Sequence, residues 1–130
     1  FNSEKKPASL SRSVIDYLRK TLEFGGITIS DDMHMGGIAE YYSPDEACIT
    51  GINAGIDVFI YRHSQNRELE LIQEIVDSVK KGTIQEQTIN QSVWKILNLK
   101  KKYRLEAKKI CQNFYPHRLN QKIESLTYKQ

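Results

Sequence analysis

Two short runs decide the fold, FGGITISDD at residues 24–32 and AGIDVFIY at residues 54–61. In each run a glycine precedes a few apolar, mostly β-branched residues, a stretch too short for a helix and typical of a strand buried on both faces. We therefore predict strands over residues 27–30 and 57–61. Gly25 and Gly26 are expected to provide the backbone reversal that leads into the first strand.

Helical patterns flank both strands. Apolar residues recur at helical spacing in four segments, residues 10–22, 44–55, 72–79 and 89–105. Ser9 or Ser11 can cap the first helix, the run SPDE at residues 43–46 predicts a capping box at the start of the second, and Gly55 predicts its left-handed end. Helices that alternate with short apolar strands indicate βαβ units, so we predict the α/β class with a parallel sheet and right-handed crossovers.

The chain of 130 residues is too short for a complete (β/α)8 barrel, which takes roughly 200 to 250 residues. Two strands with apolar faces also cannot form a stable sheet alone. The sequence starts at Phe1 with neither an initiator Met nor a leader. We therefore expect a piece of a longer protein, whose remaining part completes the sheet.

Composition and charge exclude several classes of protein. No apolar run approaches the roughly 18 to 20 residues that cross a bilayer, so no membrane partner is expected. Two cysteines, Cys48 and Cys111, are too few for a disulfide scaffold, which favours a reduced, cytoplasmic setting, and Cys48 is expected to be buried. Residues 100–130 hold nine Lys and Arg against two Asp and Glu. Without a recognised binding motif, this basic segment indicates a solvated face and no nucleic-acid partner.

Reactive groups of parallel α/β proteins collect at the carboxyl ends of the strands. Asp31 and Asp32 follow the first predicted strand, and Arg62 and His63 follow the second. One of the adjacent carboxylates can serve as a nucleophile. The alternative is that one Asp caps the following turn while the other faces water. The spacing alone leaves both interpretations open.

Residues 18–35, LRKTLEFGGITISDDMHM, resemble the active-site signature of glycoside hydrolase family 3. In that family the Asp directly after the Ser is the catalytic nucleophile, which places this role on Asp31. The chain departs from the family pattern at Tyr17 and Thr21, which are both helix positions. The resemblance continues through residues 7–11, 54–58 and 82–103, so it covers about the first 105 residues in order.

The resemblance implies a fold and an activity. It implies that residues 1–105 are the C-terminal βαβα segment of a (β/α)8 barrel, followed by a basic, partly helical extension at 106–130. Asp32 followed by Met33 and Met35 resembles the bacterial β-N-acetylglucosaminidase branch, whose members remove terminal β-linked N-acetylglucosamine by a retaining mechanism. Peptidoglycan fragments are the implied substrates, and no cofactor is implied. The branch takes its proton donor from an upstream Asp-x-His motif and binds sugar through an upstream Lys-His motif, and neither motif is in this chain.

Asp32-Met33-His34 reads literally as Asp-x-His, but it adjoins the predicted nucleophile instead of lying upstream. We therefore expect Asp32 and His34 to bind substrate at the pocket rim, not to form the donor pair. His63 and His117 have no metal-ligand spacing. Tyr17 and Trp94 lie at helical spacing among apolar residues and are expected in the core.

These observations predict a nucleophile-bearing fragment of a β-N-acetylhexosaminidase that is inactive alone. Its partners are then a carbohydrate substrate and the missing N-terminal part of the barrel. The sequence does not distinguish a hydrolase, which transfers the sugar to water, from a phosphorylase, which transfers it to phosphate. The alternative function is a non-catalytic module that associates with itself or a partner through open sheet edges.

Overall fold

The computed structural model describes residues 6–62 and 68–105. The chain divides into two units, Phe1–Ile96 and Leu97–Gln130, and the features below belong to the first unless stated otherwise. The predicted extension at 106–130 lies outside the described residues, as do His63, Cys111 and His117. Within the described ranges, no helix has the length and apolar character needed to span a membrane.

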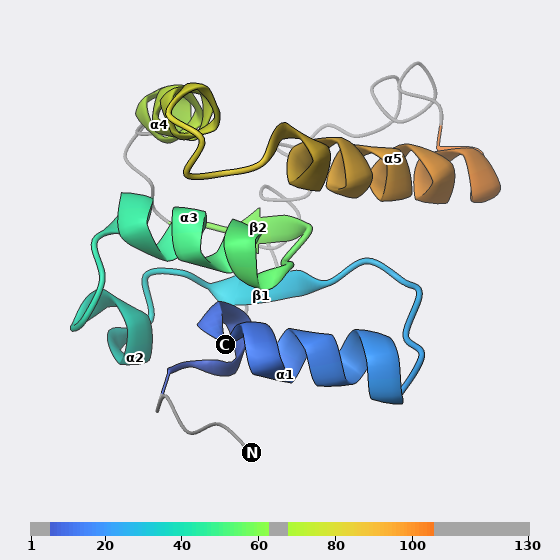
Figure 1. Ribbon diagram of the computed structural model, residues 1–130, viewed down its shortest axis with the longest axis horizontal. Coiled ribbons are helices and arrows are strands. Elements are labelled where there is room, and N and C mark those ends of the chain that lie inside the picture. Colours follow the sequence, from blue (N-terminus) through green and yellow to red (C-terminus); the bar gives the residue numbers. More distant parts are fainter. Residues whose placement is uncertain (1–5, 63–67, 106–130) are drawn as a thin grey trace, which may run out of the picture. The chain divides into compact units, whose positions relative to one another are not determined.

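Helices and two short strands alternate along the chain (Figure 1), which confirms the α/β class. The elements are η1 (Ala8–Leu10), α1 (Arg12–Asp16), η2 (Tyr17–Thr21), β1 (Ile29–Asp32), α2 (Gly36–Ala39), α3 (Pro44–Ala54), β2 (Val58–Ile60), α4 (Glu68–Lys80) and α5 (Glu86–Lys102). The boundary between the two units falls inside α5. The short helix α2 was not predicted, because its two glycines carry no helical pattern.

Helix α3 begins and ends as the sequence predicts. The Ser43 side chain accepts a hydrogen bond from the backbone N–H of Glu46, and the Glu46 carboxylate accepts one from the backbone N–H of Ser43. Pro44 occupies the first helical position, where its missing N–H costs nothing. Gly55 ends the helix with a φ of 109°, a backbone conformation that favours glycine.

The first helix differs from its prediction at both ends. Ser11 stands at the cap position of α1, but its side chain makes no capping hydrogen bond to the helix backbone. The helix widens into the π-helical segment η2, where the N–H of Leu22 donates to the carbonyl of Tyr17. The backbone reversal that follows uses Glu23, with a φ of 52°, while Gly25 and Gly26 keep negative φ values. The prediction of a glycine reversal is therefore wrong, because the widened helix places its left-handed residue earlier.

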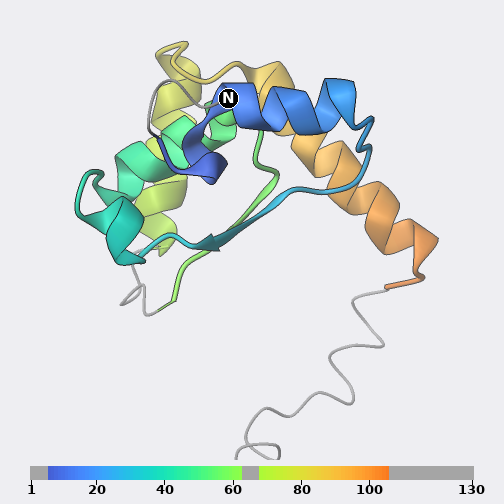
Figure 2. The same cartoon turned by 90° about the horizontal axis from the view of Figure 1, so that it is seen from below.

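Strands β1 and β2 are parallel neighbours, as predicted. Burial on both faces is not confirmed, because Ile29 is 59% exposed and Ile60 is 46% exposed. Figure 2 shows the two strands along one side of this unit, with α1 and α3 on the other. The described residues thus cover only one face of the sheet. β1 also starts two residues later than expected and includes both aspartates.

The pairing of the strands is irregular where β1 carries Ser30 and Asp31. Ile29 pairs with Val58 and Asp32 pairs with Ile60, so β1 has one more residue than β2 between these points. Such an extra residue is a β-bulge, which bends the strand and re-aims a side chain. The hydroxyl of Ser30 accepts the backbone N–H of Ile60 at 3.0 Å within the bulge.

The core consists of three small clusters, and Phe59 of β2 packs against all of them. Cys48 is 1% exposed, as expected for a buried thiol. The predictions for Trp94 and Tyr17 are wrong, because these side chains are 68% and 39% exposed. Their helices do present apolar residues at helical spacing, but the described elements leave Trp94 largely and Tyr17 partly exposed.

Candidate active site

Asp31 lies at the end of β1, inside the bulge, and its side chain is exposed. Its Oδ1 accepts the backbone N–H of Asp32 at 2.7 Å. Asp31 also lines a hollow of about 480 Å³ whose other walls are largely apolar, among them Leu18, Phe24 and Ile29. The carboxylate of the predicted nucleophile is thus oriented by a backbone amide and accessible to a ligand.

The carboxylate of the neighbouring Asp32 is hydrogen-bonded to backbone N–H groups. Its Oδ1 accepts the backbone N–H groups of His34 and Arg62, both at 3.1 Å. These two hydrogen bonds, that of His34 foremost, hold the pKa of Asp32 below its ordinary value of 3.8. Asp32 therefore remains charged at neutral pH, and its side chain is 21% exposed.

His34 lines a second hollow, of about 360 Å³, together with Glu40, Tyr41 and Tyr42. Its ring meets that of Tyr61 edge-on, with centroids 5.5 Å apart. The Nδ1 atom lies 3.7 Å from Oδ1 of Asp32, which is too far for a hydrogen bond. Asp31 and His34 thus line different hollows, and the structure does not bring them together as nucleophile and donor.

Tyr61 and Cys48 lie beneath this end of the sheet. The Tyr61 hydroxyl donates to the carbonyl of Pro44 at 3.0 Å, and burial raises the pKa of Tyr61. Burial also raises the pKa of Cys48 to about 11. The thiol therefore stays protonated at neutral pH and is not a nucleophile of this site.

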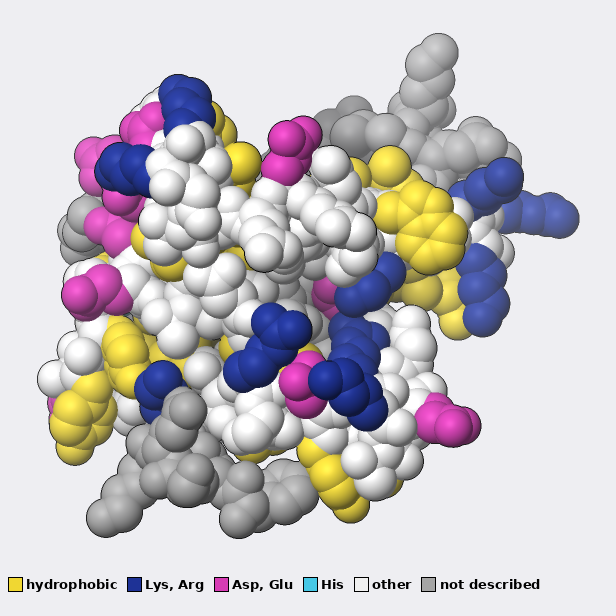
Figure 3. Space-filling view, viewed as in Figure 1, with side chains coloured by type: hydrophobic (Ala, Val, Ile, Leu, Met, Phe, Trp, Pro, Cys, Tyr) yellow, Lys and Arg dark blue, Asp and Glu magenta, His cyan; other side chains and the backbone are white. Residues whose placement is uncertain are grey.

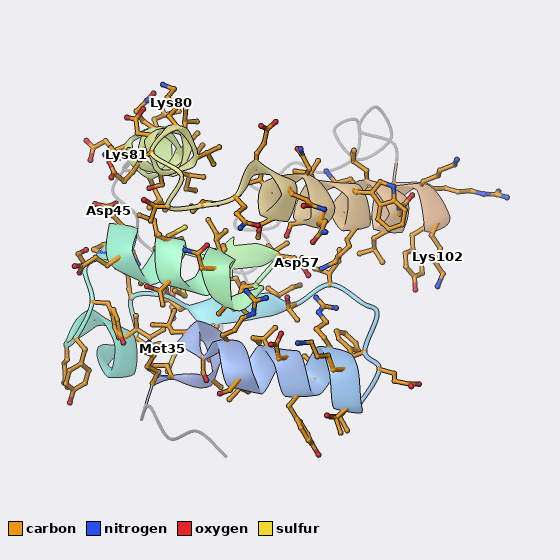
Figure 4. The ribbon with its side chains drawn as sticks, viewed as in Figure 1. Met35, Asp45, Asp57, Lys80, Lys81 and Lys102 are labelled. Carbon is orange, nitrogen blue, oxygen red and sulfur yellow. The ribbon has the colours of Figure 1, made fainter. Side chains whose placement is uncertain are left out.

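A charged cluster that the sequence analysis did not predict surrounds Asp57 at the amino ends of the strands (Figure 4). The Asp57 side chain is 1% exposed. Its Oδ2 accepts from Arg19 at 2.7 Å and from Thr28, and its Oδ1 accepts from Ser92 and Lys95, both at 2.8 Å. One carboxylate thereby joins η2, both strand entrances and α5.

A signal for this cluster was present in the sequence. Asp57 stands between the apolar residues Ile56 and Val58, and a charge in such a run needs partners when it is buried. On the face shown in Figure 3, Lys and Arg side chains gather over the middle of the molecule around a few carboxylates. Among the ion pairs of the described residues, Arg19 and Lys95 both pair with Asp57, and Lys20 pairs with Asp16. Arg19 and Lys95 are therefore paired with a buried carboxylate, whereas the pair of Lys20 and Asp16 lies at the surface.

The arrangement at the carboxyl ends of the strands suits attack by a carboxylate. Asp31 offers an oriented, accessible oxygen beside an apolar hollow. Among the residues that the structure describes, no group of three or more His, Cys, Asp or Glu side chains could hold a metal ion. The candidate site is thus built on Asp31 and Asp32, while His34, which the sequence also predicted for the site, lines a separate hollow.

Comparisons with known proteins show which family the chain belongs to. The model of the family described as glycosyl hydrolase family 3 N terminal domain matches residues 1–99. A curated relative, Beta-hexosaminidase A of Pseudoalteromonas piscicida, is 26% identical over 104 residues, which cover 75% of this chain and 17% of the relative.

Two solved structures are similar in fold as well as in sequence. The family 3 β-N-acetylglucosaminidase of a Paenibacillus species is 30% identical, with a TM-score of 0.75 over 80% of this chain and 20% of that chain. The β-N-acetylglucosaminidase of Thermotoga maritima is 27% identical, with a TM-score of 0.65 over 71% of this chain and 21% of that chain. The chain therefore spans about a fifth of the length of these proteins.

Proposed function

The chain belongs to glycosyl hydrolase family 3, and from this membership we propose that it is the nucleophile-bearing part of a retaining β-N-acetylglucosaminidase. In the proposed reaction the Asp31 carboxylate attacks the anomeric carbon and displaces the aglycone, which leaves with a proton from a general acid. Water then attacks the glycosyl-enzyme ester, and the sugar is released with its anomeric configuration retained.

The observation that carries this proposal is the placement of Asp31. Its carboxylate is exposed at the carboxyl end of β1, is oriented by the N–H of Asp32, and opens onto the apolar hollow. A nucleophile on a strand end is held more rigidly than one on a loop, which favours a productive approach to the sugar. The names of the similar hexosaminidases support the choice of an N-acetylglucosaminide as substrate.

The general acid is proposed to come from a segment outside this chain. The only described histidine, His34, lines a different hollow from Asp31. We propose that residues 1–105 are the C-terminal segment of a (β/α)8 barrel and that the remaining barrel supplies the acid and most sugar contacts. The chain spans about a fifth of its relatives, which supports this division. Muropeptide-like fragments in the cytoplasm are the proposed physiological substrate.

Replacement of the nucleophile tests the proposal in the protein that carries this chain together with its barrel. Asp31→Ala should reduce turnover of an aryl N-acetyl-β-glucosaminide by roughly 10⁴-fold, because no covalent intermediate can form. Asp77→Asn is the matched control, since the Asp77 carboxylate bonds only to Gln73 and Lys80 in the contacts described on α4. Wild-type turnover by Asp31→Ala would overturn the assignment.

The same assay distinguishes the acceptor. In phosphate-free buffer a hydrolase releases free N-acetylglucosamine at its full rate. A phosphorylase needs inorganic phosphate and releases the sugar 1-phosphate. We expect the rate to be independent of phosphate, and a requirement for phosphate would contradict hydrolysis while leaving the role of Asp31 in place.

A further inference from the structure

Asp32 connects the two segments that leave the carboxyl ends of the strands. His34 follows β1, and Arg62 lies two residues beyond the end of β2. The backbone N–H groups of both residues donate to the same oxygen, Oδ1 of Asp32, at 3.1 Å. One side chain thereby joins positions that are 30 residues apart in the sequence.

The backbone of Asp32 also contacts the proposed nucleophile. Its N–H donates to Oδ1 of Asp31 at 2.7 Å. A shift of Asp32 would therefore move the donor that orients Asp31. The contact is next to the bulge, where β1 has one residue more than β2 and regular ladder hydrogen bonds are interrupted. Side-chain hydrogen bonds are most needed at such a place to fix the backbone.

We propose that Asp32 is a positioning residue, which clasps the segments after β1 and β2 and so fixes the Asp31 carboxylate at the site. The proposal rests on the proposed function only in taking Asp31 as the nucleophile. The side chains of His34 and Arg62 interact electrostatically with the Asp32 carboxylate, and Nδ1 of His34 lies 3.7 Å from its Oδ1. Hydrogen bonds from an N–H to a carboxylate are stronger than those to a neutral oxygen, so the charge of Asp32 strengthens the clasp.

Amide hydrogen exchange in the full chain tests the clasp without any substrate. Asp32→Ala removes the acceptor, and the N–H groups of His34 and Arg62 should then exchange roughly tenfold faster or more. Asp32→Asn keeps an acceptor oxygen without the charge, so both amides should exchange at rates between those of the wild type and the Ala variant. The matched control Asp77→Ala should leave both amides unchanged.

Two measurements on Asp32→Ala, amide exchange and kcat, can each overturn the proposal. If the exchange rate of either amide changes by less than about twofold in Asp32→Ala, the clasp is overturned. Loss of a hydrogen bond to a charged group should change the exchange rate by more than that factor. In the active protein, Asp32→Ala should lower kcat at least about tenfold with a smaller effect on KM, and Asp32→Asn should restore part of kcat. A wild-type kcat for Asp32→Ala would overturn the positioning role. Failure of the Asp31 assignment would show separately, as activity in Asp31→Ala.

Discussion

The Ser30 hydroxyl takes the place of a backbone acceptor inside the bulge. It accepts the N–H of Ile60 at 3.0 Å, and the regular contact resumes where the N–H of Met33 donates to the carbonyl of Ile60. Ser30 is 4% exposed, and its hydrogen bond with the N–H of Ile60 is partly buried. The residue before the proposed nucleophile thus helps to hold the bulge in place.

We predict that Ser30→Ala lowers the free energy of unfolding by about 1 kcal/mol, because it removes a partly buried hydrogen bond to the N–H of Ile60. Urea denaturation of the full chain measures this loss. Ser30→Thr keeps the hydroxyl, and its loss should be the smaller of the two. Equal losses for the two variants would show that the hydroxyl does not hold the bulge.

For single residues, the sequence predicts which side chains stand at the strand ends but not the hydrogen bonds that they make. Asp31 was placed at a strand end from the order of apolar residues and from the family signature. The clasp made by Asp32 and the hydrogen bond of Ser30 were not predicted. Both depend on which residue of β2 lies opposite the bulge, and this pairing joins residues about 30 positions apart, which local spacing does not specify.

At the element scale, Asp57 joins η2, the two strand entrances and α5 through a carboxylate that is 1% exposed. We predict that Asp57→Ala lowers the free energy of unfolding by about 2–4 kcal/mol, because it leaves Arg19 and Lys95 without their shared partner. Asp16→Ala is the matched control, since Asp16 also pairs with two cations, Arg12 and Lys20, but at the surface. The control should lose less than about 1 kcal/mol. Equal losses in the two variants would contradict a special role for the buried cluster.

The cluster also gives stability a pH dependence. Burial raises the pKa of Asp57, but hydrogen bonds from Lys95, Thr28 and Ser92 outweigh it and hold the pKa below the ordinary value of 3.8. A lowered pKa stabilises the fold above the pKa of the unfolded chain, and this contribution is lost as the pH falls below 3.8 toward the pKa of the folded state.

We therefore predict that Asp57→Asn flattens the acid side of the stability curve. Denaturation midpoints of the full chain between pH 6 and the acid limit provide the measurement, and the wild type should lose stability more steeply below 3.8 than the variant. The control Asp16→Asn should keep most of the wild-type slope, because its carboxylate is more exposed. Parallel curves for the wild type and Asp57→Asn would contradict the assignment.

Element boundaries were predicted well where a local motif decides them and poorly where packing does. The capping box at Ser43 and the glycine end at Gly55 need only neighbouring residues, and both are confirmed. The widening of the first helix into η2 places the reversal at Glu23. Arg19 holds the following turn by donating to the carbonyls of Phe24 and Gly26, and such contacts cannot be deduced from spacing.

At the scale of the whole molecule, apolar side chains are exposed on the uncovered face of the sheet and on α5. Ile29 and Ile60 are 59% and 46% exposed, and Trp94 is 68% exposed. The sequence predicted these residues as buried because they occupy apolar positions of strand and helix patterns. In the described residues, no other helix or strand packs over these apolar positions enough to bury them. For this reason the predictions that Tyr17 and Trp94 lie in the core are wrong.

We predict that the isolated chain associates through this surface. Light scattering should give a mass that rises with concentration, and Ile29→Lys should reduce the rise, because it places a charge on the uncovered strand face. Ser13→Lys, on the exposed side of α1, is the control for added charge. A monomeric mass over the whole concentration range would contradict edge or face pairing.

In the proposed reaction Asp31 forms the covalent bond to the sugar. The most direct test traps that bond in the protein that carries this chain with its barrel. A dinitrophenyl N-acetyl-β-glucosaminide, whose leaving group needs no acid, is mixed with the protein, quenched in acid and mapped by peptide mass spectrometry. We predict one N-acetylglucosaminyl adduct on the peptide that contains Asp31, absent from Asp31→Ala. Turnover with the adduct on another residue, or an adduct that persists in Asp31→Ala, would contradict the account.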